Sequence, residues 1–176
     1  IQGETGIMAM NGEEGQGPLK FGVAAVDMFT GMNAAQAILA VLYERHTTGQ
    51  GRHIQMALFD NGLAITSYYG LAAWLGRKDP AKFGNSHPAI VPYGVFQAKD
   101  GPLVIAVGNN GQFKRFCEEV IEQPELAADP RFAKNTQRSQ NRHALLQILE
   151  GIIGSFERAE LISRLQNAGI PCGEVF

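Results

Sequence analysis

The stretch FGVAAVDMFTG, residues 21–31, carries a single carboxylate, Asp27, where a strand-like apolar run gives way to a helical pattern. An acid at such a junction has two interpretations. Aspartate is a preferred N-cap residue, because its side-chain oxygen accepts a backbone N–H of the first helical turn. The alternative is a functional role for the acid, which its residue type alone does not specify. Asp60, which follows MALF, has an equally good N-cap interpretation, so residue type alone does not separate the two acids.

A second candidate is the segment VGNNGQF, which lies between a predicted strand and a predicted helix. Its central residues are Gly108, Asn109, Asn110, Gly111 and Gln112. Backbone N–H groups at the start of a helix can face an anion or a developing oxyanion. The competing interpretation is an ordinary turn with asparagine caps, since Gly and Asn are the usual residues where the backbone takes a positive φ.

The segment HPAIVPY contributes His87 and Tyr93 as candidates for the vicinity of a substrate. A loop histidine between Ser and Pro is, on the other interpretation, simply solvated. The two cysteines, Cys117 and Cys172, have no Cys or His at metal-ligand spacing, so we expect neither a metal site nor a disulfide framework. Cys117 lies on an apolar helical stripe and is expected to pack inertly in the core.

Composition limits the class of protein. The chain has 176 residues, 45% hydrophobic and 18% charged, which is typical of a globular protein. A net charge of −2 gives no electrostatic argument for binding nucleic acid or an anionic membrane surface. Gly, Asp or Tyr interrupts the apolar stretches before they reach the length of a membrane span. We therefore expect a soluble, cytoplasmic protein.

The residue pattern of the first half of the chain is typical of an α/β domain. An apolar run at 19–26 predicts a buried strand, residues 28–46 predict a helix buried on most of its surface, and alternation over 52–60 predicts another strand. Strand, helix and strand form a βαβ unit. A second apolar helix is predicted at 61–75.

A Pro- and Gly-rich stretch at 76–92 predicts a linker, and a second unit follows it. We expect a hairpin of two strands around the turn KDG, a helix from about Gln112, and two more amphipathic helices. The predicted organisation is thus part of a large α/β domain at 1–75, a linker at 76–92 and a small α+β domain at 93–176. Both ends look cut, so a fragment of a longer chain is expected.

Four ordered blocks carry a resemblance to a known family: FGVAAVDMFTGMNAAQAILAVLYERHTTGQGRHIQMALFD, GNSHPAIVPYGVFQAKDG, LVIAVGNNGQF and AGIPCGEV. Together they resemble the family III coenzyme A transferases, which include formyl-CoA transferase and carnitine CoA-transferase. The resemblance implies a middle section of a longer chain, with a Rossmann-like large domain and a smaller domain. It also implies a homodimer of interlocked subunits that takes acyl-CoA and a carboxylic acid as substrates and holds no permanent cofactor.

The resemblance also implies roles for residues. Asp27 matches the catalytic aspartate, which forms a mixed anhydride and then an aspartyl-CoA thioester. Residues 108–112 match the glycine-rich loop that closes over this aspartate and shields reactive intermediates from water, although Asn stands here where some members have Gly. Two alternatives stay open: an alpha-methylacyl-CoA racemase of the same fold, and a non-catalytic module.

Overall fold

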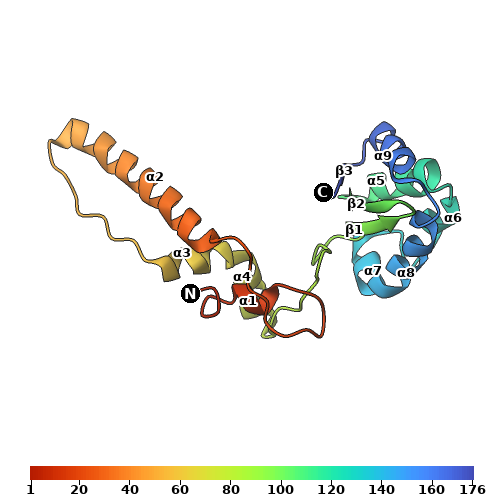
Figure 1. Ribbon diagram of the computed structural model, residues 1–176, viewed down its shortest axis with the longest axis horizontal. Coiled ribbons are helices and arrows are strands. Elements are labelled where there is room, and N and C mark those ends of the chain that lie inside the picture. Colours follow the sequence, from red (N-terminus) through yellow and green to blue (C-terminus); the bar gives the residue numbers. More distant parts are fainter. The chain divides into compact units, whose positions relative to one another are not determined.

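The computed structural model describes all residues from 1 to 176, and they divide into two compact units, Ile1–Gly84 and Asn85–Phe176 (Figure 1). The boundary between the units lies within the stretch 76–92, which the sequence analysis interprets as a linker. Each unit has its own secondary structure and its own packing.

The first unit is helical. Its elements are α1 (Ile7–Met10), α2 (Ala25–Thr48), α3 (Leu58–Ile65) and α4 (Ser67–Gly76). The predicted helix at 28–46 is confirmed as the central part of α2. This helix ends at Gly49, which takes φ 71° and donates its N–H to the carbonyl of Arg45 at 2.8 Å. Glycine suits that position because it adopts the left-handed conformation without steric cost.

The two strands predicted in this unit are wrong. Residues 19–24 are irregular and lead directly into α2, and residues 52–57 run as an extended connection from the end of α2 back to α3 (Figure 1). A strand exists only with a hydrogen-bonded neighbour, and neither segment has one in this chain. The helix predicted at 61–75 is two helices, because the backbone breaks at Thr66 with φ −90° and ψ 3°.

The expectation that α2 is buried on most of its surface is also wrong for this chain, because only Val26 is buried. Large apolar side chains of α2 are exposed: Met28, Met32, Ile38, Leu39, Leu42 and Tyr43. With 24 residues and a mean hydropathy of 1.4 over its most apolar window, α2 is also long and apolar enough to cross a membrane. This differs from the expectation that interruptions exclude a span, but one such helix is weak grounds for membrane insertion.

The second unit is a small α+β domain. A three-stranded antiparallel sheet has the order β1-β2-β3, with β1 at Tyr93–Ala98, β2 at Gly101–Ala106 and β3 at Cys172–Glu174. The helical elements are α5 (Asn110–Arg115), the π-helix η1 (Phe116–Val120), α6 (Pro124–Ala128), α7 (Asn135–Gln140), α8 (Arg142–Ile153) and α9 (Arg158–Asn167). The predicted hairpin and amphipathic helices are confirmed.

The core of the second unit lies between one face of the sheet and the helices. Side chains alternate along β1 and β2, so that Phe96, Leu103 and Ile105 point inward. The predicted apolar stripe is confirmed as buried: Phe113, Phe116, Cys117, Val120 and Ile121. Burial raises the pKa of the Cys117 thiol to about 12, as inert packing requires. The stripe continues through η1, where the N–H of Ile121 bonds to the carbonyl of Phe116 at 3.0 Å.

Candidate active site

Asp27 is the third residue of α2, and the N-cap position belongs to Ala24, which makes no side-chain capping bond. The N-cap interpretation of Asp27 is therefore wrong, because a capping side chain must precede the first helical residue. The side chain of Asp27 is exposed and makes no hydrogen bond or ion pair within the chain. The structure therefore places this carboxylate in the first turn of α2, near the N-terminal N–H groups of the helix, with both oxygens free.

Asp60 occupies the same position in α3, third from the start, and its N-cap interpretation is equally wrong. It too is exposed. The residue after it is different: Asn61 is buried and accepts a hydrogen bond from Asn33 of α2 at 2.5 Å. The amide of Asn61 also donates to the carbonyl of Ala57 at 2.8 Å. The start of α3 is thus an attachment point to α2, and helix position alone does not distinguish the two acids.

The segment before Asp27 is held by Gln2, a residue that no pattern in the sequence singles out. The side-chain amide of Gln2 donates to the carbonyls of Phe21 and Val23 at 3.3 and 3.2 Å, and its oxygen accepts the N–H of Phe21 at 3.0 Å. Gln2 therefore fixes the approach of the chain to α2. No sequence pattern signals such a contact across about twenty residues of Gly-rich chain.

The loop at 108–112 is a capped helix start. The side-chain oxygen of Asn109 accepts the N–H of Gln112 at 2.9 Å, and the side-chain oxygen of Gln112 accepts the N–H of Gly108 at 2.7 Å. The interpretation as a turn with asparagine caps is confirmed, although neither glycine of the loop takes a positive φ. The N–H groups of Asn109, Asn110 and Gly111 have no acceptor in the chain. The loop is exposed there, so these donors are available to an anion.

His87 organises its own loop rather than being simply solvated. Its Nδ1 accepts the N–H groups of Ala89 and Ile90, each at 3.0 Å, and its ring stacks on Tyr93 with centroids 5.1 Å apart. Burial, and then the charge of Arg142, lower the pKa of His87. The neutral ring therefore carries its proton on Nε2, because Nδ1 is an acceptor. The structure brings the two candidates of HPAIVPY together as one stacked pair.

The predicted site residues are divided between the two units. Asp27 belongs to the first unit, whereas His87, Tyr93 and residues 108–112 belong to the second. No group of three or more His, Cys, Asp or Glu side chains is arranged to hold a metal ion.

Comparison with known proteins shows the family. The model of CoA-transferase family III matches residues 1–176, so this chain belongs to CoA-transferase family III. Among curated relatives, it is 38% identical over 175 residues to acetyl-CoA:oxalate CoA-transferase of Acetobacter aceti, covering 98% of this chain and 44% of that protein. It is 34% identical over 175 residues to succinate–glutarate CoA-transferase of Agrobacterium fabrum, covering 99% and 44%.

Solved structures agree with this assignment. A CAIB/BAIF family protein from Brucella suis matches with a TM-score of 0.78 and 39% identity, over 99% of this chain and 46% of that one. Rv3272 from Mycobacterium tuberculosis matches with a TM-score of 0.83 and 25% identity, over 99% and 45%. The chain therefore spans less than half the length of these relatives.

Proposed function

We propose that this chain is the part of a CoA-transferase that carries the nucleophile, and that the nucleophile is Asp27. The reaction moves coenzyme A from an acyl-CoA donor to a carboxylic acid. The observation that carries the proposal is the carboxylate of Asp27, exposed in the first turn of α2 without any hydrogen bond or ion pair in the chain. Relatives named for CoA transfer between carboxylic acids support the reaction class.

The proposed chemistry begins with attack of an Asp27 oxygen on the donor thioester carbonyl. The C–S bond breaks, CoA leaves as a thiolate, and a mixed anhydride forms. The thiolate then attacks the aspartyl carbonyl and releases the donor acid as a carboxylate, which leaves an aspartyl-CoA thioester. The acceptor carboxylate attacks that thioester, and the same two steps run in reverse. No net proton or electron is transferred, and the hard exchange is divided into easier steps.

A carboxylate suits this role because every intermediate is an activated acyl group, an anhydride or a thioester. A serine nucleophile would form an ester, which returns its acyl group less readily. Activated intermediates are also open to hydrolysis, so the site must exclude water. In this proposal the loop at 108–112 supplies that cover and offers its free N–H groups to developing negative charge, and His87 with Tyr93 lies near the substrate.

The proposal includes the state of the whole protein. We infer a chain of the relatives' length that binds acyl-CoA as a substrate, without a permanent cofactor, and assembles as an interlocked homodimer in the cytoplasm. The exposed apolar side chains of α2 support a surface that the rest of the protein or a second subunit covers. Succinate, glutarate and oxalate, which name the relatives' reactions, are the first acids to test.

The test traps the intermediate in the protein at the relatives' full length. Incubation with succinyl-CoA or acetyl-CoA, addition of hydroxylamine and peptide mass spectrometry should give a hydroxamate on Asp27. Asp27→Asn should abolish both the hydroxamate and the transfer. Asp60→Asn is the matched control, because Asp60 has the same helix position and exposure, and it should keep both. An unmodified Asp27, with solvent deuterium entering the acyl chain, would favour the racemase instead.

A further inference from the structure

Two residues of the short helix α7, Asn135 and Arg138, form hydrogen bonds to the two loop segments of the candidate site. Asn135 and Arg138 lie one turn apart, so they project from one side of the helix. Neither residue stands out in the sequence. Between them they make hydrogen bonds to Asn110 of the 108–112 loop and to the backbone of 89–91.

Arg138 is completely buried, and its charge has no carboxylate partner. Its Nε donates to the carbonyl of Val91 at 2.6 Å, its Nη1 to the carbonyl of Phe132 at 2.9 Å, and its Nη2 to the side-chain oxygen of Asn110 at 3.0 Å. The guanidinium also stacks over the ring of Phe113 at 4.2 Å. Burying a cation is costly unless its donors are satisfied, and here neutral oxygens from three separate segments satisfy them.

Asn110 is the point where the 108–112 loop is attached. Its side-chain oxygen accepts the backbone N–H of Asn135 and the Nη2 of Arg138, each at 3.0 Å. Both partners are donors, so the oxygen, rather than the amide nitrogen, must face α7. A glycine at this position would lose both bonds.

Asn135 makes the matching attachment to the other segment. Its side-chain oxygen accepts the N–H of Val91 at 3.1 Å, and its amide donates to the carbonyl of Ala89 at 2.8 Å. The same segment contains His87, whose Nδ1 accepts the N–H groups of Ala89 and Ile90. One helix therefore holds the His87 turn and the 108–112 loop at the same time.

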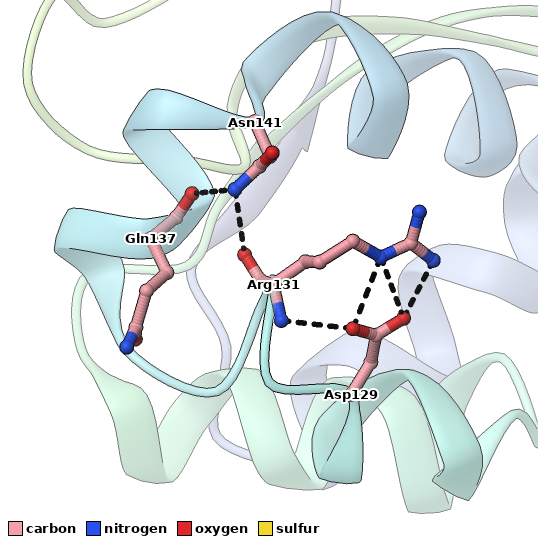
Figure 2. A network of polar contacts seen from close by, with 4 residues as sticks. All are labelled: Asp129, Arg131, Gln137 and Asn141. Atoms are coloured by element: carbon pink, nitrogen blue, oxygen red, sulfur yellow. Dashed lines mark hydrogen bonds and ion pairs between the residues drawn. The ribbon is translucent and has the colours of Figure 1, made fainter.

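Polar contacts at both ends of α7 fix the helix itself, and Figure 2 shows those that involve Asn141, Arg131 and Asp129. Asn141, just after α7, donates to the carbonyl of Arg131 at 3.3 Å and to that of Gln137 at 2.9 Å. Arg131 is held in turn by the carboxylate of Asp129, with contacts of 2.6–3.1 Å, and Arg131 lowers the pKa of that carboxyl group. At the other end, the N–H of Lys134 bonds to the side-chain oxygen of Gln137 at 2.9 Å.

From these contacts we propose that Asn110, Asn135 and Arg138 form a clamp that positions the 108–112 loop and couples it to the His87 turn. The clamp holds the loop in a preformed shape, so that the loop covers the acyl intermediate without first having to order itself. A glycine at position 110 would give the loop more conformational freedom, whereas Asn110 attaches the loop to α7 through two hydrogen bonds. The inference rests on the proposed function only for its catalytic consequence, because the coupling is a property of the second unit.

The catalytic test uses the protein at the relatives' full length and measures the ratio of acyl-CoA hydrolysis to CoA transfer. Loss of both bonds to α7 should raise this ratio by about fivefold or more in Asn110→Gly, the scale of one or two lost hydrogen bonds. Asn135→Ala keeps the backbone N–H that bonds Asn110 and frees only the 89–91 segment, so it should raise the ratio through the coupling, by less than Asn110→Gly does. Thr136→Ala, an exposed residue of α7, is the matched control. A purely structural role would lower stability and transfer but leave the ratio unchanged, which would overturn the proposed clamp.

The coupling test does not depend on activity. Hydrogen exchange should show that Asn110→Gly speeds exchange of the Val91 N–H as well as of Gly108 and Gln112, and that Asn135→Ala does the same from the other side. Arg138→Lys, which keeps the charge but loses the three-way fork, should loosen both segments. Exchange that changes only in the mutated segment contradicts the coupling. If Asp27 is not trapped but both segments loosen together, the proposed reaction fails while the clamp stands.

Discussion

His87 is held in its loop by an acceptor atom, and that makes the loop sensitive to acid. Protonation places a hydrogen on Nδ1, which faces the N–H groups of Ala89 and Ile90, each at 3.0 Å. Two acceptor bonds would be replaced by two donor–donor contacts. The charge of Arg142 opposes protonation further, and together with burial it lowers the pKa of His87.

The sign of the pH dependence follows from that shift. The unfolded chain, with a histidine pKa near 6.5, binds the proton more readily than the folded chain does, so stability rises with pH. The contribution of His87 is fully present above the ordinary pKa and is lost as the pH falls below it. We expect the urea midpoint, followed by circular dichroism, to fall between pH about 7.5 and about 5 by more than in His87→Asn.

The control for this prediction is a substitution that keeps the hydrogen-bond acceptor and removes the titratable group. Asn places an oxygen where Nδ1 lies, so His87→Asn keeps an acceptor that cannot titrate. Equal slopes in wild type and His87→Asn would show that His87 binds its proton equally well in the folded and unfolded chains, which contradicts the prediction.

Residue type predicted candidates but not their environments. Asp27 and Asp60 were indistinguishable in sequence, and both prove to be third residues of their helices rather than caps. The cap at Asn109 was predictable because Asn before a short helix is a local signal. Gln2 and Arg138 were not predictable, because their partners are far away in sequence and their roles depend on tertiary contacts.

Among the elements, predictions succeeded where the stabilising partner lies within the chain. Apolar residues at helical spacing predict the helix α8, and Leu145, Leu149 and Ile153 are all buried. The runs at 19–26 and 52–60 have the alternation or β-branched content of strands, but no neighbouring strand is available to them. A periodic pattern reports which face is apolar, whereas strand formation also requires a hydrogen-bonding partner.

The packing of α8 can be tested with one substitution. Leu149 is fully buried in the core of the second unit, so Leu149→Ala should lower the free energy of unfolding by about 2–5 kcal/mol, as in other core truncations. Gln147→Ala, two residues away on the exposed face of the same helix, should change it by about 0.5 kcal/mol or less. Urea unfolding curves of the two variants make the comparison. Equal small effects would mean that the core does not depend on α8.

At the scale of the molecule, the two units differ in how much apolar surface they bury. The hydrophobic core cluster lies entirely in the second unit, from Val91 to Ile170. In the first unit Val26 is the only hydrophobic residue that is buried. Because burial of apolar surface is the main favourable contribution to folding, we expect the segment 85–176 to fold alone and the segment 1–84 to need a covering partner.

The single tryptophan of the chain reports on that covering. Trp74 of α4 is 77% exposed, and it shares the first unit with other exposed apolar side chains, including Leu71 and Leu75. Leu71, Trp74 and Leu75 are three and four residues apart on α4, so they share one side of this helix, and an exposed apolar surface of this kind is normally an interface. In a protein of the relatives' full length we therefore expect Trp74 to show blue-shifted emission and weak acrylamide quenching, whereas the present chain alone should show solvent-like emission and strong quenching.

The dependence of Trp74 quenching on protein concentration distinguishes cover by another part of the same chain from cover by a second subunit. If the remaining part of the same chain covers Trp74, its quenching should not depend on protein concentration. If a second subunit covers it, dilution below the dimer dissociation constant should expose it, because association stabilises the covered state by mass action. Tyr43, which is 79% exposed and lies toward the C-terminal end of α2, provides a second position. If one partner covers both positions, a Tyr43→Trp variant in a Trp74→Phe background should show the same dependence of quenching on protein concentration. Strong quenching at both positions in the longer protein would mean that both side chains stay open to water. The inference of an interlocked dimer would then lose its structural support.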